Sequence, residues 1–438
     1  MSTPENLQSA PQNPPRRRKK RPNNNLPLLL LLLFVLLCAS GPYLIWRFQP
    51  TRAIPTLIVD KTVPNHTYRE HDALIWSLNH YKVESADNNT FWDKTNNYVG
   101  FYPAPYPGFS VENPGKGELL QTSDVQGKQL VFVTDTYGIY SQDIRDAVDY
   151  EKRLEAKESM VPVQDVSNVA PLESPDYSEK IYGGMQAEEV SVLENHVQKG
   201  GHLIGEFNLF ASPTRGAERA RLENLFGVKW SGWTGRFFLE LENKEEVPAW
   251  ARRNYEAQYG KPWTFTGKGW AFVHEDSRIL VLEEDRRVDG KMQKQDLPAQ
   301  ALRIELEDHD LLKNVYDRVP YTYWFDVVEP TENTRVLAHY QFKLRESGKK
   351  KLKASGLPER FPFLLMASEQ PLRLYLAGDA SDRDHDAGIY QLAGRMQWER
   401  VGRFKEKKRS QEAFFWEFYL PWMDNVLRHV ATTPCAQC

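Results

Sequence analysis

Cysteine is scarce in this chain of 438 residues, which has only three. Cys38 lies in an apolar run, and Cys435 and Cys438 form a C-x-x-C pair at the carboxyl end. That pair is compatible with a disulfide or with half of a metal site, but a structural zinc site needs four ligands. We therefore expect a frayed tail, no bound metal and no cofactor.

Sequence motifs of several enzyme classes are also missing. The chain has no G-x-S-x-G, no G-x-x-x-x-G-K, no G-x-G-x-x-G and no H-E-x-x-H. These absences argue against an α/β-hydrolase, a P-loop NTPase, a dinucleotide-dependent enzyme and a zinc protease. His66 and His71 are five residues apart, so one face of a helix would not present both of them to a metal.

The chain has no overall excess of positive charge. Its formal net charge is -3, and 41% of its residues are hydrophobic, which is enough to form the cores of two or three domains. Residues 1–25 carry six basic side chains against Glu5 alone, a net +5, which leaves -8 for the remainder. A mildly acidic body offers no basic face to nucleic acid, so we expect no nucleic-acid partner.

One long apolar run is present, from Leu26 to Trp46, and no second run of this kind follows. As a helix, its 21 residues would rise about 30 Å, which is one hydrocarbon core. The basic residues before it place the N-terminus in the cytoplasm and residues 47–438 outside. The sequence thus predicts a single-pass protein of a bacterial inner membrane, with a periplasmic or extracellular main domain.

A cleaved signal peptide is the alternative for this run. The small residues Cys38, Ala39 and Ser40 resemble a cleavage region, and the run from Leu28 to Leu37 has the length of a signal-peptide apolar core. Apolar residues resume from Tyr43 to Trp46, however, which favours an uncleaved transmembrane helix.

The body of the chain alternates buried strands with amphipathic helices. We expect helices at about 67–82, 186–199, 215–226 and 411–430, and a kink at Pro421 in the last one. Apolar strands are expected at 56–60, 129–135, 202–210, 362–367 and 372–379. Strand–helix alternation with apolar strands predicts an α/β fold with a parallel, flavodoxin-like sheet.

The middle of the chain has a different pattern. Short alternating stretches rich in Trp and Tyr predict an antiparallel β insertion or subdomain at residues 229–359. The predicted organisation is therefore a basic tail at 1–25, a transmembrane helix at 26–46, a linker at 50–55, and an α/β domain at 55–228 and 360–430 around the insertion. Trp230, Trp233, Trp263 and Trp270 are compatible with a sugar-stacking surface or with the core of the insertion.

Four acidic residues fall at the carboxyl ends of predicted strands, where open parallel sheets bind ligands: Asp60, Asp135, Glu206 and Asp379. In one site they would raise each other's pKa and could act as acid and base, whereas singly each could cap a following helix or turn. The candidate binding residues around them are Lys61, His66, Arg69, Glu70, His71, Asn208, Arg215, Arg236 and Asp382.

The segment GGMQAEEVSVLENHVQKGGHLIGEFNLF, residues 183–210, resembles the central helix, strand and turn of the class I glutamine amidotransferase-like superfamily. LYLAGDASD, residues 374–382, is similar to the end of the same fold. Active members carry a cysteine in a G-x-C-x-G elbow, whereas this chain has Gly205-Glu206-Phe207-Asn208 there. The resemblance therefore implies a degenerate domain, and we expect no hydrolysis of glutamine, which needs a thiolate by that route.

Two functions from different classes remain open. The first is a binding module for a ligand or an envelope partner, in the assembly or export of cell-envelope polysaccharide. The second is a hydrolase that acts on envelope glycans with Glu206 and another strand-end carboxylate. The sequence alone leaves open whether the chain is an enzyme.

Overall fold

The computed structural model describes residues 25–438 except 86–90, 156–178, 245–246, 299–301, 318, 320, 322, 384–386, 404–410 and 436. The predicted basic tail at 1–25 lies, apart from Asn25, outside the described residues.

Nine strands form one mixed sheet in the order β13-β15-β16-β17-β7-β4-β1-β2-β3. The strands β17, β7, β4, β1 and β2 run parallel, and the outer strands pair antiparallel. The expected parallel α/β sheet is thus the centre of a larger mixed sheet. The strand bounds are β1 (Thr56–Asp60), β2 (Val99–Pro103), β3 (Gly115–Gly117), β4 (Leu130–Asp135), β7 (His202–Gly205), β13 (Leu302–Leu306), β15 (Arg335–Phe342), β16 (Arg360–Glu369) and β17 (Leu372–Leu376).

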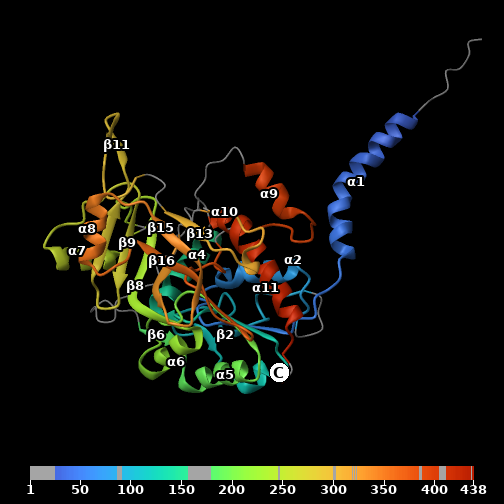
Figure 1. The fold of residues 1–438 in the computed structure, drawn as a ribbon, viewed down its shortest axis with the longest axis horizontal. Coiled ribbons are helices and arrows are strands. Elements are labelled where there is room, and N and C mark those ends of the chain that lie inside the picture. Colours follow the sequence, from blue (N-terminus) through green and yellow to red (C-terminus); the bar gives the residue numbers. More distant parts are fainter. Residues whose placement is uncertain are drawn as a thin grey trace, which may run out of the picture.

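Helices cover both faces of the parallel strands, because alternate side chains of these strands point to opposite faces. Ile58 packs into one core with α2 (Asp72–His80) and α11 (Leu420–Thr432). Leu57 and Val59 pack into a second core with α5 (Ala187–Gln198) and α6 (Gly216–Phe226). Figure 1 shows α5 and α6 together at the bottom of the view and α2 beside α11 on the right. The centre of the fold therefore has three layers.

A second, antiparallel sheet has the order β10-β9-β8-β14. Its strands are β8 (Val228–Phe238), β9 (Gly269–His274), β10 (Ile279–Glu283) and β14 (Phe325–Pro330). Beside it lie α7 (Ala249–Tyr259) and α8 (Glu346–Ala354), which contact β10. The segment 229–359 is therefore rich in β-structure, but its strands β13 and β15 extend the main sheet instead of standing apart from it.

The remaining elements are short or connect the layers. They are η1 (Arg69–His71), α3 (Thr122–Val125), β5 (Ile139–Tyr140), α4 (Ser141–Glu155), β6 (Lys180–Tyr182), β11 (Arg286–Val288), β12 (Lys291–Gln293), η2 (Asp310–Leu312), α9 (Arg395–Arg403) and α10 (Gln411–Phe414). A π-helical turn, η3 (Phe415–Tyr419), separates α10 from α11. It lies directly before Pro421, which cannot donate a helical hydrogen bond, so the expected interruption of the last helix is present there.

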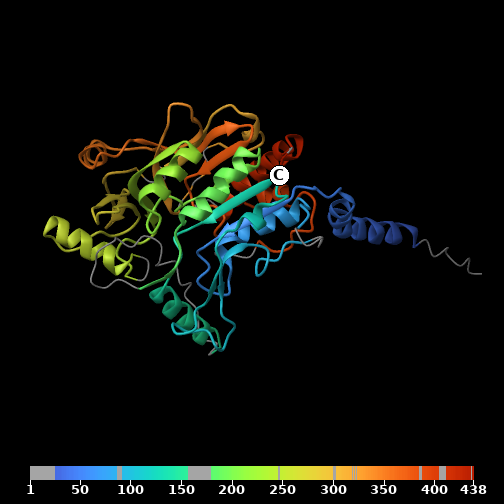
Figure 2. The same cartoon turned by 90° about the horizontal axis from the view of Figure 1, so that it is seen from below.

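Helix α1 (Leu26–Phe48) projects from the body (Figures 1 and 2). Within the described residues, no single helix is long and apolar enough to span a membrane. The two parts of α1, Leu26–Cys38 and Ser40–Phe48, have the required length and apolarity together, and the helix bends by 48° between them. Pro42 lies just after the bend and removes the hydrogen bond to the carbonyl of Cys38, which accounts for its position. The predicted transmembrane helix is therefore unconfirmed and remains a proposal.

The carboxyl end is ordered by contacts, contrary to the expected frayed tail. Cys435 and Cys438 form a disulfide. The Cys438 carbonyl accepts a hydrogen bond of 3.0 Å from the Gly127 amide. The tail is thus fastened to the loop that precedes β4.

The two sheets share one hydrophobic core, so we expect them to unfold together. Phe272 of β9 is fully buried and contacts Phe325, Phe342 and Phe361 at ring-centroid distances of 5.7–5.9 Å. Phe272→Ala should lower the free energy of unfolding by about 3–5 kcal/mol in a single transition, measured by guanidinium denaturation in detergent.

The matched control is Val288→Ala, at a half-exposed position in β11, which should change stability by less than about 0.5 kcal/mol. A separate early transition of the second sheet in Phe272→Ala, with the main sheet unaffected, would contradict a shared core.

Candidate functional site

The acidic residues predicted at strand ends do lie along one edge of the main sheet. Asp60 and Asp135 end β1 and β4, Glu206 follows β7, and Asp379 lies three residues after β17. These four strands are consecutive neighbours in the sheet, so their carboxyl ends are adjacent. All four side chains are buried, and Asp60 and Glu206 are completely inaccessible. The sheet therefore gathers carboxyl groups away from water.

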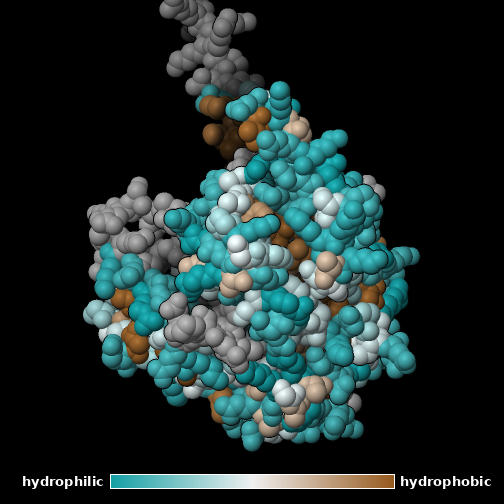
Figure 3. Space-filling model, turned by 90° about the vertical axis from the view of Figure 1, so that its left-hand side faces the viewer, coloured by the Kyte–Doolittle hydropathy of each residue, from teal (hydrophilic) through white to brown (hydrophobic). Residues whose placement is uncertain are grey.

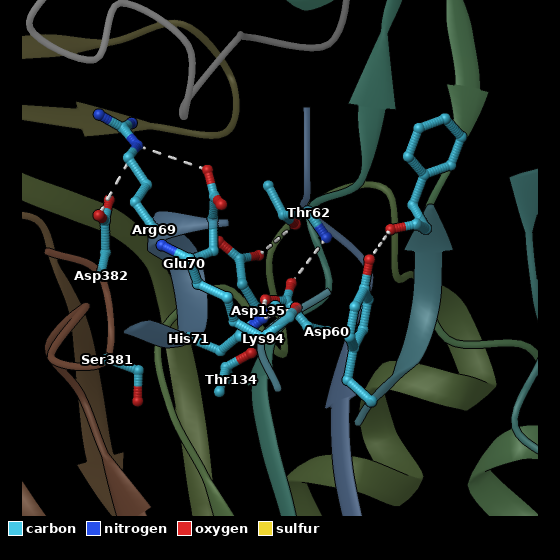
Figure 4. A network of polar contacts seen from close by, with 12 residues as sticks. Asp60, Thr62, Arg69, Glu70, His71, Lys94, Thr134, Asp135, Ser381 and Asp382 are labelled. Atoms are coloured by element: carbon cyan, nitrogen blue, oxygen red, sulfur yellow. Dashed lines mark hydrogen bonds and ion pairs between the residues drawn. The ribbon is translucent and has the colours of Figure 1, made fainter. Parts of the chain in front are cut away.

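Asp60 forms a hydrogen bond with His71 (Figure 4). Nδ1 of His71 lies 2.6 Å from Oδ2 of Asp60, and both side chains are fully buried. The other ring nitrogen, Nε2, lies 2.9 Å from the Lys94 carbonyl, which can only accept a hydrogen bond. Both ring nitrogens of His71 are thus engaged, and the carboxyl of Asp60 fixes the orientation of the imidazole.

Thr62 connects Asp60 to Asp135. Its amide donates to Oδ1 of Asp60 and its hydroxyl to Oδ1 of Asp135, both at 2.9 Å. The Tyr137 amide donates a second bond of 2.7 Å to that oxygen of Asp135. Burial, together with the charge of Asp60, raises the pKa of Asp135 despite these donors. The two carboxyl groups thus form a coupled pair held by one threonine.

Glu206 has one oxygen bound and one open. Its Oε2 accepts a 3.0 Å hydrogen bond from the amide of Ser381. The hydroxyl of Ser381 lies 2.8 Å from the hydroxyl of Tyr419. Oε1 of Glu206 is buried and has no donor in hydrogen-bonding geometry among the described residues. Burial raises the pKa of Glu206 to about 8. The side chain is therefore largely protonated at neutral pH and can donate a hydrogen bond as well as accept one.

The turn after β7 places Asn208 between the two sheets. Asn208 has a left-handed backbone with φ 62°, a conformation that asparagine tolerates better than most residues. Its amide donates to Oδ2 of Asp326 at 3.0 Å, and its side-chain nitrogen lies 3.5 Å from Oδ2 of Asp135. Its Oδ1 is buried without a hydrogen-bond partner among the described residues. Asn208 thus presents an open acceptor beside the carboxyl pair.

Asp326 of β14 holds this turn in place and was not predicted as a site residue. It is fully buried and accepts hydrogen bonds from the Tyr375 hydroxyl at 2.6 Å and from Thr234 at 3.2 Å. Burial raises its pKa to about 6. An aspartate inside the apolar strand FDVVEP carries no local signal of this role, because its partners come from distant segments.

Arg69 joins two further carboxyl groups, Glu70 and Asp382 (Figure 4). Its Nε lies 3.4 Å from Glu70 and 3.7 Å from Asp382, which also accepts a hydrogen bond of 3.1 Å from Tyr323. Burial raises the pKa of Glu70, the charges of Asp382 and Asp60 add to the rise, and Arg69 opposes it. Oε2 of Glu70 is buried without a hydrogen-bond partner in the described chain.

Arg236 reaches the same region from β8 of the second sheet. Its guanidinium lies 5.4 Å from the ring centre of Tyr323, the residue that donates to Asp382, and 5.2 Å from that of Trp324. The side chain is buried, so these aromatic faces stabilise its charge. Both sheets therefore contribute to the polar cluster.

Three predicted residues lie outside the cluster. Lys61 is buried and pairs with Glu189 at 2.6 Å, because neighbouring residues of a strand end face opposite sides of a sheet. Burial lowers the pKa of Lys61. His66 contacts the Ala104 carbonyl at 2.9 Å, and Arg215 is exposed and bonds Ser212 at 3.2 Å.

The tryptophans of the insertion are mostly core residues. Trp230, Trp233 and Trp270 are buried, whereas Trp263 is half-buried and stacks edge-on with Tyr255 and Phe265. Figure 3 shows a largely hydrophilic surface with small, scattered apolar patches on one side of the molecule. The buried tryptophans therefore form no exposed stacking surface.

The geometry supports acid–base and hydrogen-bonding chemistry at the carboxyl edge. In the described part of the chain, no group of three or more His, Cys, Asp or Glu side chains has the arrangement of a metal site. What the cluster offers is a set of buried carboxyl groups with raised pKa values and three buried oxygens without a hydrogen-bond partner in the described chain, on Glu206, Asn208 and Glu70.

No protein-family model matches the chain, and no curated protein matches its sequence. Several solved structures are similar to it. A ThuA-like protein from Bacteroides uniformis ATCC 8492 is 10% identical, with a TM-score of 0.34 over 87% of this chain and 93% of that one. A ThuA-like protein from Parabacteroides merdae ATCC 43184 is 11% identical, with a TM-score of 0.29 over 74% and 79% of the two chains. A cytoplasmic protein from Salmonella typhimurium LT2 is 11% identical, with a TM-score of 0.30 over 86% and 99%.

The raised pKa of Glu206 predicts a defined dependence of stability on pH. The native side chain keeps a proton that the unfolded chain releases near pH 4.5, so stability falls as pH rises from about 4.5 to about 8. Relative to Glu206→Gln, the wild type should lose roughly 3–5 kcal/mol across this range, measured by urea denaturation at several pH values.

Glu332→Gln, at an exposed position, is the control and should follow the wild type. If the curves for wild type and Glu206→Gln ran parallel from pH 5 to pH 9, Glu206 would not retain its proton.

Proposed function

We propose that the α/β domain binds a hydroxyl-rich ligand, a glycan of the cell envelope, at the carboxyl edge of its sheet. The observation that carries this proposal is the set of buried oxygens without a hydrogen-bond partner among the described residues, Glu206 Oε1, Asn208 Oδ1 and Glu70 Oε2. A buried polar group left unpaired costs about 1–3 kcal/mol, so a ligand that pairs with these oxygens would recover that free energy.

A sugar hydroxyl suits these groups better than an anion or a metal ion. A hydroxyl donates and accepts, which matches a protonated Glu206 and the amide oxygen of Asn208. The surrounding carboxyl groups would repel an anion, and the described residues provide no metal-ligand group.

We further propose that α1 anchors this domain in a bacterial inner membrane, with the N-terminus cytoplasmic and the body periplasmic or extracellular. Every residue from Leu26 to Cys38 is exposed, and the six basic residues precede them. The disulfide between Cys435 and Cys438 supports an oxidising compartment for the body. A polysaccharide or a second envelope protein is the proposed partner.

A degenerate class I glutamine amidotransferase-like domain is the proposed ancestry of the body. The resemblance of residues 183–210 and 374–382 to parts of that superfamily supports this proposal. Phe207 occupies the cysteine position of the G-x-C-x-G elbow, in the stretch Gly205-Glu206-Phe207-Asn208. The chain also has no cysteine between Cys38 and Cys435.

The binding proposal predicts a loss of affinity in Asn208→Gly, which keeps the left-handed backbone and removes the unpaired Oδ1 together with the side-chain donor to Asp135. With cello-, chito- and maltotetraose as probes, the wild type should bind at least one of them. The variant should bind it about tenfold more weakly, as expected for one lost hydrogen bond, measured by calorimetry in detergent.

Asn314→Gly is the matched control, because Asn314 has the same φ of 62° in the loop after η2. Its affinity should equal that of the wild type. Equal affinities for the wild type and Asn208→Gly, or no saturable binding of these sugars by the wild type, would count against the site.

Hydrolysis is the second candidate, and the protonated Glu206 beside the coupled carboxyl Asp135 is the observation that favours it. A carboxylic acid can protonate a leaving group, whereas a glutamine amide cannot. The binding proposal predicts that the wild type releases no reducing ends from the sugars and no ammonia from glutamine, and that Glu206→Gln still binds at pH 7.

Production of reducing ends that falls to background in Glu206→Gln would establish the hydrolase instead. Release of ammonia from glutamine by the purified protein would overturn the proposed loss of glutaminase activity.

A further inference from the structure

The second half of α1 is fastened to the body and does not end in a free linker. Trp46 is buried among Tyr43, Phe91 and Tyr390, with ring-centroid distances of 6.0–6.4 Å. Its indole nitrogen donates a 2.8 Å hydrogen bond to the carbonyl of His80 at the end of α2. The anchor helix and the α/β domain therefore meet through a packed contact.

Polar contacts fix the same junction on both sides of Trp46. The amide of Ala393 donates to the Pro42 carbonyl at 3.0 Å, and Lys82 Nζ donates to the carbonyls of Arg47 and Gln49 at 3.1 and 2.6 Å. Beyond the helix, Arg52 pairs with Asp424 of α11 at 2.6 Å. The expected linker at 50–55 is thus held against the body, which restricts how the body is oriented relative to α1.

Large apolar side chains are exposed around this junction, and we call them the collar: Tyr43, Phe48, Phe91, Ile389 and Trp398. Ile389 is 59% and Trp398 is 67% exposed, which is unusual for side chains of this size. Phe91 contacts Tyr390, the neighbour of Ile389, at 6.0 Å, and Trp398 lies in α9, which begins two residues after the Ala393 contact. The collar therefore continues the exposed apolar surface of α1 onto the body.

A basic side chain lies at the junction of α1 and the body. Arg47 is exposed at the end of α1. Basic side chains next to aromatic ones are the composition that favours the headgroup region of a bilayer.

We propose that the collar lies in the lipid headgroup region and holds the body flat against the membrane from which α1 emerges. This inference rests on the proposed anchoring of α1 and adds a second contact with the bilayer. A lipid surface is the proposed partner because the collar is continuous with the apolar half of α1. That half of the helix lies inside the bilayer if α1 is the membrane anchor.

The test uses the full-length protein in vesicles of phosphatidylcholine and phosphatidylglycerol that contain a lipid with a nitroxide headgroup. Cys38 is the free thiol, because Cys435 and Cys438 are bonded to each other. In a Cys38→Ser background, Ile389→Cys or Trp398→Cys carries a fluorophore, and Tyr259→Cys is the control at an exposed site on α7. A label on the native Cys38 reports on the anchor separately.

We expect the labels at 389 and 398 to be quenched severalfold more strongly than the label at 259. The collar would be wrong if the labels at 389 and 398 were quenched no more strongly than the label at 259. The anchor would remain intact in that case if a nitroxide placed deep in the acyl chains still quenched the Cys38 label strongly. If the Cys38 label also escaped quenching, both the anchor and the collar would be wrong. Self-quenching of the 398 label without lipid quenching would assign the collar to a second copy and overturn the lipid contact.

Discussion

Carboxyl groups gathered in a buried place cannot all be ionised, and the organisation of this site follows from that constraint. Two like charges 4 Å apart repel by about 4 kcal/mol at an effective dielectric constant of 20. The sheet places Asp60, Asp135 and Glu206 along one edge out of contact with water. Protons and cations must therefore balance the charge: burial raises the pKa of Glu206 to about 8, His71 contacts Asp60 at 2.6 Å, and Arg69 faces Glu70.

Both sheets are needed for this balance. The parallel strands supply the acidic ends, and the antiparallel sheet supplies Asp326, which holds the Asn208 turn, and Arg236, whose charge is stabilised by aromatic faces. The shared aromatic core, in which Phe272 of the antiparallel sheet contacts Phe342 and Phe361 of the main sheet, fixes the position of one sheet on the other. A function that uses this edge, in binding or in hydrolysis, therefore depends on the insertion as well as on the α/β core.

The sequence predicted the strand ends well, because an apolar run followed by an acidic residue has a simple meaning in a parallel sheet. The third strand was predicted to extend to Phe210, whereas β7 ends at Gly205. The prediction was too long because the left-handed turn at Asn208 does not interrupt the run of hydrophobic residues. Asp326 was missed because its partners come from distant segments. Lys61 was included because it follows Asp60, although adjacent residues of a strand end face opposite sides.

The central claim is that Glu206 is a neutral carboxylic acid at neutral pH. Infrared difference spectroscopy between the wild type and Glu206→Gln measures this directly, because a protonated carboxyl and a carboxylate absorb at separate frequencies. At pH 7 the difference spectrum should contain the carbonyl band of a protonated carboxyl, and the band should titrate away near pH 8. A spectrum at pH 7 that contains only carboxylate bands would contradict the proton-retaining site.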